Sequence, residues 1–270
     1  MGEPALITPN DHGTRKLLRR SAIARTPLEA LLEQIAWDSL YVIHDDFDAD
    51  DLDSRWVQGE RPDDPDLGGW QFDSIYASGA IKGRPENRTL KLISSRQVWH
   101  ADRRCALVSR LSVDEITRGK FEIGFADIDA EHLHDAQGVI EIKSTPSVYP
   151  NRVNFAVAVR DTDDDTNIGL AAAASTAAPG EGSGGSVSVT DSTGAEAITA
   201  QTEFTVLVAT NEMQESRLWI NGIPAATNRS GPNRDSALSI WLLFDQRLGT
   251  GGPEVRLDYI RAWQERATLS

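Results

Sequence analysis

The chain has 270 residues, of which 40% are hydrophobic and 25% are charged, and its formal net charge is −14. This composition is typical of a globular protein, and the length is enough for one large domain or two smaller ones. The acidic balance argues against a bulk nucleic-acid binder, which is normally basic. No direct nucleic-acid partner is therefore expected.

A single cysteine, Cys105, excludes an intrachain disulfide. It lies in an alternating apolar pattern, where a free cysteine behaves as a small hydrophobe, and this favours assembly in a reducing cytoplasm. The first residues lack the apolar run of a signal peptide. No stretch reaches the roughly 18 apolar residues of a membrane span. We therefore expect no membrane partner.

The N-terminal stretch before Thr26 is basic, unlike the rest of the chain. Five basic residues against two acidic ones give it a charge of +3 and leave −17 for the remainder. The pattern predicts an extended arm that docks on an acidic partner, with a solvated tail as the open alternative. The basic residues are Arg15, Lys16, Arg19, Arg20 and Arg25.

A short amphipathic helix is expected directly after this arm. Thr26 suits the N-cap, Pro27 the first helical position and Glu29 the third. Apolar residues then share one helical face up to about residue 37. With the arm, this helix forms a predicted anchoring region at 1–38. The apolar residues of that face are Leu28, Leu31, Leu32, Ile35 and Ala36.

From residue 39 onward, apolar residues recur with a period of two, and turn signals separate the segments. About a dozen short strands at this spacing are typical of an antiparallel β-sandwich. Asn221-Gly222 between two apolar runs predicts a tight hairpin. We expect one sandwich over 39–270. The predicted strands lie at 41–43, 52–56, 70–72, 89–92, 105–113, 121–126, 139–142, 153–159, 168–174, 186–190, 204–208, 217–223, 238–244 and 255–263.

The last strand is the most regular of these segments. Val255, Leu257 and Tyr259 alternate with Arg256 and Asp258, which indicates a half-buried antiparallel strand. A strand at the chain end needs neighbours made earlier in the chain. It is therefore expected to close the fold by long-range pairing.

Three segments resemble the concanavalin A-like jelly rolls, the superfamily of lectins, laminin-G domains and glucanases. Residues 45–56 are similar to its first strand, 217–222 to its Asn-Gly hairpin, and 257–263 to its closing strand. The resemblance spans about residues 40–265. It implies an all-β antiparallel jelly-roll sandwich, here with an N-terminal extended arm and a short α-helix.

A narrower resemblance concerns residues 121–127, 138–143 and 157–162. Their succession is similar to jelly-roll proteins encoded among tailed-phage virion genes. In such proteins the domain serves as a head decoration, fibre or minor tail component. The resemblance implies a virion role, with the major capsid protein or other virion proteins as partners.

Retaining glucanases need two catalytic carboxylates on one strand face. Asp127, Asp129 and Glu131 come nearest to the usual Glu-x-Asp-x-x-Glu signature, but the first residue and the spacing both differ. Glu141 is a lone strand carboxylate. The chain is therefore predicted not to be an enzyme, and glycoside hydrolysis of the jelly-roll glucanase type ranks third among its functions.

Metal binding has one candidate segment, the run Asp161-x-Asp163-x-Asp165. It begins like a calcium loop, but Thr166 replaces the glycine and Ala172 the final glutamate. The acidic stretch 45–53 offers further oxygen ligands. No metal site and no cofactor are expected, and calcium stays the open alternative.

Tryptophan provides the remaining candidate site. Of the seven tryptophans, Trp219 is the one most expected at the surface, because Leu218 and Ile220 share the opposite face of its strand. An exposed indole can stack on a sugar ring. Trp219 is therefore the candidate residue for carbohydrate binding.

These observations lead to one primary prediction and one alternative. The primary prediction is a structural protein of the phage virion, assembled in the host cytoplasm, which decorates or cements the capsid through residues 1–38 and forms homo-oligomers. The alternative is a carbohydrate-binding module that attaches to a host or surface glycan.

Overall fold

The computed structural model describes residues 7–9, 15–17, 40–48, 51–59, 69–73, 79–85, 89–129, 138–143, 147–148, 154–163, 167–174, 186–192, 198–247 and 253–266. The chain separates into two compact units, Met1–Trp37 and Asp38–Ser270. Each unit is described by itself.

The first unit contains a small antiparallel pair of strands, β1 (Ile7–Pro9) and β2 (Arg15–Leu17). The other residues of the predicted arm lie outside the described part of the chain. Arg15 and Lys16 lie on β2. The expected helix after Thr26 lies outside the described residues. So do Arg19, Arg20, Arg25, Leu28, Leu31 and Leu32.

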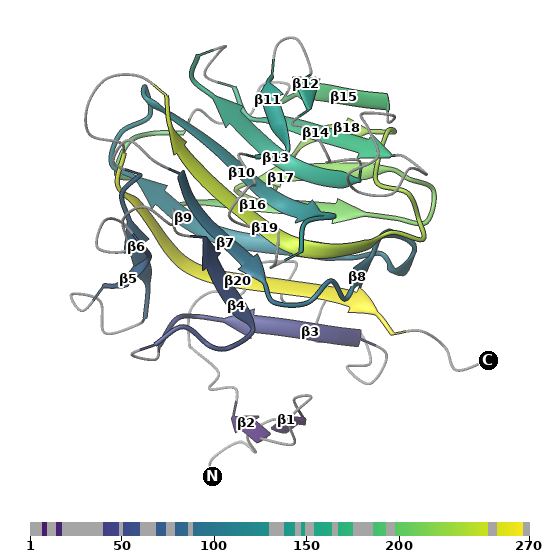
Figure 1. Cartoon of the computed structure of the whole chain (residues 1–270), viewed down its shortest axis with the longest axis horizontal. Coiled ribbons are helices and arrows are strands. Elements are labelled where there is room, and N and C mark those ends of the chain that lie inside the picture. The colour runs from purple at the N-terminus through teal and green to yellow at the C-terminus, as the bar shows by residue number, and fades with distance from the viewer. Residues whose placement is uncertain are drawn as a thin grey trace. The chain divides into compact units, whose positions relative to one another are not determined.

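The second unit is a sandwich of two antiparallel sheets, which confirms the predicted fold class (Figure 1). We name each sheet after its two central strands. The β9–β20 sheet runs β18 (Ile223–Asn228), β17 (Ser216–Ile220), β16 (Phe204–Thr210), β9 (Ala106–Val113), β20 (Val255–Glu265), β6 (Ile81–Gly83) and β5 (Gln71–Phe72), with β3 (Leu40–Asp45) also on β20.

The β10–β19 sheet lies against it. It runs β15 (Ser186–Asp191), β14 (Gly169–Ala174), β13 (Phe155–Asp161), β10 (Gly119–Ala126), β19 (Ala237–Gln246), β7 (Thr89–Ser94) and β4 (Trp56–Gly59), with β8 (Trp99–His100) also on β19. A short 3-10 helix, η2 (Ala101–Arg103), follows β8, and β11 (Ile140–Ile142) pairs with β12 (Ser147–Val148). No helix among the described residues is long and apolar enough to span a membrane.

The main core lies between the sheets and follows the period of two. On β16, Phe204, Val206 and Val208 are buried, while Thr205 and Leu207 are only half-buried. The β10–β19 sheet carries a second buried cluster on its outer face, which includes Val157, Val159, Trp241 and Leu243. As a result, every residue of β10 is buried. This departs from the half-buried strand that a period of two usually indicates.

The closing strand β20 pairs with β9 on one side and with β6 and β3 on the other. Long-range closure is thus confirmed. The register slips between Leu257 and Tyr259, where Asp258 bulges and accepts a hydrogen bond from Arg110. Such a bulge moves every later side chain to the opposite face. Tyr259 therefore points outward and Ile260 inward, which corrects the simple alternation expected from the sequence.

The Asn221-Gly222 turn joins β17 to β18 as expected. Both residues have positive φ angles, 51° and 77°, which a two-residue hairpin of this hand requires. Asn228 at the end of β18 is buried, and its side-chain amide donates to the carbonyl oxygens of Leu170 and Ser188 in the other sheet. The Asn228 side chain thus links the two sheets by hydrogen bonds at one end of the sandwich.

Candidate functional site

The outer face of the β10–β19 sheet holds a buried ion pair. Lys120 and Glu122 alternate with the core residues of β10, so both point away from the main core. The Lys120 ammonium lies 2.9 Å from Glu122 Oε1, and the two side chains are 1% and 0% exposed. A buried charge pair of this kind is costly unless its remaining hydrogen-bonding capacity is satisfied.

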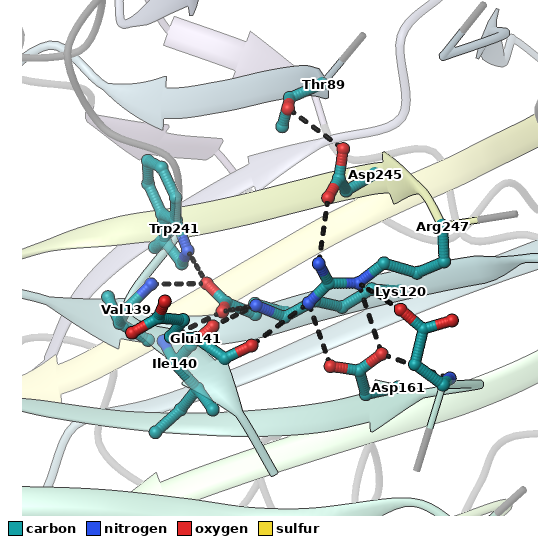
Figure 2. A network of polar contacts seen from close by, with 11 residues as sticks. Thr89, Lys120, Val139, Ile140, Glu141, Asp161, Trp241, Asp245 and Arg247 are labelled. Carbon is teal, nitrogen blue, oxygen red and sulfur yellow. Dashed lines mark hydrogen bonds and ion pairs between the residues drawn. The ribbon is translucent and has the colours of Figure 1, made fainter. Parts of the chain in front are cut away.

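Residues 138–143 satisfy that capacity, and we call them the strap. The backbone N–H groups of Val139 and Ile140 donate to Glu122 at 2.8 and 3.0 Å. Lys120 donates to the carbonyl oxygen of Ile140, and Trp241 Nε1 donates to Glu122 Oε2 at 2.8 Å. Figure 2 shows Lys120, Val139, Ile140 and Trp241 within this network. Both carboxylate oxygens are therefore fully engaged.

Gly138 is needed where the strap begins. Its φ angle is +131°, and a Cβ at this position would lie 2.9 Å from Glu122 Oε1. A side chain would collide with the ion pair and would also strain the backbone. Glycine thus permits the close approach that lets the next two N–H groups reach Glu122.

Two further side chains, Arg247 and Lys143, hold the rest of the strap. Arg247 Nη2 donates to the carbonyl oxygen of Glu141 at 3.1 Å. Lys143 Nζ donates to the carbonyl oxygen of Asn167 at 3.0 Å and lies 2.7 Å from Asp191 Oδ1. The strap is therefore fixed to the sheet at its start, middle and end.

Arg247 also forms ion pairs with two carboxylates beside the buried pair, those of Asp161 and Asp245, as Figure 2 shows. Its Nη2 lies 2.9 Å from Asp161 Oδ2, and its Nη1 lies 3.7 Å from Asp245 Oδ2. Thr89 donates to Asp245 at 3.1 Å. Burial raises the pKa of Asp245 above its usual range, although Arg247 acts in the opposite direction.

The register shows what faces Glu122 across the sheet. Its cross-strand neighbours are Leu243 and Val159, and the next outward positions on β10 are Gly124 and Ala126. Retaining glycosidases need a second carboxyl group about 5–5.5 Å away. Among the described residues, these cross-strand and same-strand neighbours supply none. In this conformation the network holds the strap in place.

The carboxylates singled out from the sequence serve elsewhere. Asp127 is buried and accepts the N–H of Asn154 at 3.0 Å, so it joins β10 to β13. Asp129 is half-buried, and Glu131 lies outside the described residues. The three are therefore not brought together as a catalytic set by the residues that can be described.

The calcium alternative finds no support in the described part of the chain. Asp161 and Asp163 both face the cation Arg247, and Asp165 lies outside it. Within the acidic stretch, Asp45 is buried and accepts from Trp56 Nε1 at 2.7 Å. No group of three or more His, Cys, Asp or Glu residues among those described is arranged to hold a metal ion.

Trp219 lies on the outer face of the other sheet. Leu218 and Ile220 are buried, whereas Trp219 is half-buried on the opposite side of β17. In register with it lie Pro224 on β18, Leu207 on β16 and, one strand further, Val108 on β9. We call this row the Trp219 platform. Tyr259 and Trp263 on β20 share the same face and are also half-buried.

The buried network was not foreseen from the sequence. Its only signal is the pattern of Lys120, Glu122 and Gly124 at alternate positions of one apolar strand. Trp241 lies 119 residues away from Glu122 in the chain. No sequence motif in the strap, including Gly138, indicates that this segment contacts β10.

Replacing Glu122 by Gln tests whether this network supports the fold. The variant leaves the Lys120 ammonium buried without its counter-charge, so the free energy of unfolding is expected to fall by about 3–5 kcal/mol. Adding Lys120→Met should recover at least half of this loss, because no buried charge remains. Urea unfolding followed by tryptophan fluorescence measures both.

Glu203→Gln serves as the matched control, because Glu203 has a side chain that is 46% exposed. Its effect should stay within about 0.5 kcal/mol. If Glu122→Gln unfolds at the same urea concentration as this control, the network does not hold the strap as described.

Comparison with known proteins gives no match to a family model and none to a curated protein. Solved structures do match. The carbohydrate recognition domain of Emp47p has a TM-score of 0.53 at 10% identity, with 85% of this chain and 98% of that chain covered. The endo-1,3-β-glucanase of Streptomyces sioyaensis has a TM-score of 0.54 at 10% identity, with 84% and 98% covered.

A mixed-linkage glucan GH16 protein of Bacteroides ovatus, solved with a G4G4G3G product, is similar to the same degree. Its TM-score is 0.54 at 10% identity, with 82% of this chain and 99% of that chain covered. Glycoside hydrolases are thus prominent among these structures. This finding contradicts the prediction that the chain is not an enzyme, which rested on a missing sequence signature.

At these identities the likeness establishes the fold. The second unit of this chain is an antiparallel jelly-roll β-sandwich, the fold that these solved structures share.

Proposed function

We propose that this protein binds a carbohydrate chain and that the Trp219 platform is its binding surface. The observation that carries the proposal is a half-buried tryptophan on an outward sheet face, flanked in register by Pro224 and Leu207. Aromatic side chains offer a large apolar surface with a polar edge, which suits the C–H faces of sugar rings.

The position of the platform on regular strands supports this assignment. Leu218 and Ile220, on either side of Trp219 in the chain, are buried in the core and fix the position of this part of β17. Tyr259 and Trp263 lie three strands away on the same face, which corresponds to roughly 14 Å at the usual strand spacing. A surface of this length suits an oligosaccharide better than a single sugar.

The structural neighbours favour the same class of ligand. One is named as a carbohydrate recognition domain, and another was solved with an oligosaccharide product. These names describe those proteins, and the shared fold alone does not carry their ligands over. Together with the platform they make a glycan the best-supported ligand.

Glycoside hydrolysis is the second candidate, and one observation favours it. Asp245 pairs with Lys120 across β10 and β19, so it lies one row from Glu122 on the same face. The raised pKa of Asp245 suits a general acid, and Glu122 is a carboxylate. This chemistry requires the strap to move away from Glu122.

The virion role, its shell-protein partners, the homo-oligomer and the virion location stay predictions. They rest on the resemblance of residues 121–127, 138–143 and 157–162 and on the basic N-terminal stretch. Of the five basic residues in that stretch, the structure describes only Arg15 and Lys16, which lie on β2. None of the solved structures named above is a shell protein. The carbohydrate function accounts for the second unit without them.

Binding is tested by screening the purified chain on an oligosaccharide array and measuring the best ligand by calorimetry. Trp219→Ala should weaken binding by roughly tenfold to hundredfold, since the contact of one large apolar side chain is lost. Trp219→Leu keeps apolar packing but removes the ring, and it should weaken binding as well.

Met213→Ala is the control, because Met213 is 80% exposed on the neighbouring β16–β17 turn. It should leave affinity unchanged. Equal affinity of the wild type and both folded Trp219 variants would show that the platform is not the binding surface.

Hydrolysis is tested on β-glucans and mucin-type O-glycans by following the release of reducing ends. If the second candidate holds, Asp245→Asn and Glu122→Gln should each abolish release at temperatures where the variants stay folded. The Trp219 variants should then leave the rate of release unchanged, because Trp219 lies on the outer face of the other sheet. No release by the wild type on either substrate class would dismiss this candidate.

A further inference from the structure

We propose that the glycan bound by the Trp219 platform is acidic, with an anionic group on the sugar next to the one that stacks on Trp219. This inference rests on the proposed function and names its ligand class. It is drawn from two arginines that lie beside the platform.

The first arginine is on the same strand face as Trp219. Glu215, Arg217 and Trp219 occupy alternate positions, so all three point outward. Arg217 and Trp219 are two residues apart, which corresponds to roughly 6.6–6.8 Å along a strand. This spacing is close to the length of one sugar residue. A ring stacked on Trp219 would therefore place its neighbour over Arg217.

The second arginine lies across from Glu215. Asn228 pairs with Ser216, so Arg229 follows at the position opposite Glu215. The Arg229 side chain is 88% exposed, and that of Arg217 is 55% exposed. Both guanidinium groups are thus open to solvent on the face that carries the platform.

These two cations share one carboxylate. Arg217 Nη2 lies 2.6 Å from Glu215 Oε1, while Arg229 Nε lies 3.9 Å from Glu215 Oε2. Two positive charges against one negative charge give this spot a net charge of +1. Each guanidinium has five N–H donors, so Glu215 leaves donors available to a ligand. Planar carboxylates match this donor geometry particularly well.

Glu215 also fixes the cations in place. Its backbone N–H donates to Asn211 Oδ1 at 3.1 Å, and the same oxygen accepts the N–H of Met213 at 2.9 Å. The turn before β17 is thereby closed, and Arg217 is held by the carboxylate two residues before it. A guanidinium ordered before binding loses less conformational entropy when a ligand arrives.

Small side chains surround Arg217. Its cross-strand neighbours are Ala209 on β16 and Thr227 on β18. Neither is bulky enough to cover the guanidinium, and Thr227 is exposed and adds a hydroxyl group. The outer face of β17 and β18 thus offers a stacking ring, two cations and a hydroxyl at neighbouring positions.

The whole chain has a formal net charge of −14, and this limits the kind of anion that can bind. Repulsion from the rest of the protein acts on a long polyanion, whereas a short ligand feels mainly the charges within a Debye length of about 8 Å. We therefore expect short acidic oligosaccharides to bind better than acidic polysaccharides. Added salt weakens both the attraction and the repulsion, so substitution is the sharper test.

The test uses a β-glucan tetrasaccharide in three forms: neutral, oxidised at C6 to carboxylates, and sulfated at C6. Calorimetry on the full chain should show at least about tenfold tighter binding of one or both acidic forms, since a charge-assisted hydrogen bond to a guanidinium is added. The carboxylate and sulfate forms tell which anion is preferred.

Arg217→Gln combined with Arg229→Gln should abolish this preference, so that the acidic forms bind this variant no more tightly than the neutral form does. Arg118→Gln is the matched control, because Arg118 is a half-exposed arginine paired with one glutamate, Glu115, beyond the end of β9. It should keep the preference unchanged.

The outcomes separate the two proposals. Equal binding of all three forms, with loss of binding in Trp219→Ala, overturns the acidic ligand and keeps the carbohydrate function. A preference for acidic forms that survives the double arginine variant also overturns this inference. No binding of any form in the screen or here counts against the proposed function itself.

Discussion

The Glu122 carboxylate has no contact with solvent, and this single constraint determines how one side of the sandwich is built. A buried carboxylate must be balanced and must have its oxygens filled, or the cost of removing it from water destabilises the fold. Lys120 supplies the charge, while Trp241 and two backbone N–H groups of the strap supply hydrogen bonds. The strap must therefore lie on the β10–β19 sheet.

The two sheets differ for this reason. The outer face of the β10–β19 sheet is occupied by the strap and by an apolar cluster around Val157 and Leu243. The outer face of the β9–β20 sheet instead carries half-buried aromatic residues, Trp219, Tyr259 and Trp263. We therefore place ligand binding on the second face. Hydrolysis on the first face would require the strap to be displaced and its hydrogen bonds to be replaced by substrate or water.

The sequence predicted the positions of the strands better than it predicted the contacts between them. Local alternation located β16 and β17 and correctly separated Trp219 from Leu218, because a period of two reports directly on a half-buried sheet. The Asn221-Gly222 turn was predictable because few residues adopt its φ angles. Tyr259 was placed on the wrong face, since a bulge depends on the partner strand and not on the strand's own pattern.

The remaining features depend on contacts between distant parts of the chain. Glu122 meets Trp241 and the strap only in the folded state, and Arg247 reaches Asp161 across 86 residues. The missing glucanase signature predicted that the chain is not an enzyme, yet its fold is shared with glycoside hydrolases. A short sequence motif can reveal neither the long-range contacts nor the shared fold. The charge pattern around Glu215 likewise becomes visible only when β17 and β18 are paired.

The central claim is that the β9–β20 sheet, and not the strapped sheet, receives the carbohydrate. Mapping backbone amide chemical shifts during titration with the best oligosaccharide tests it most directly. The account predicts that the largest shifts fall on β16, β17 and β18 around Trp219, with the indole N–H of Trp241 unchanged. Shifts concentrated on the strap, with Trp241 strongly perturbed, would contradict it and would place the site over Glu122.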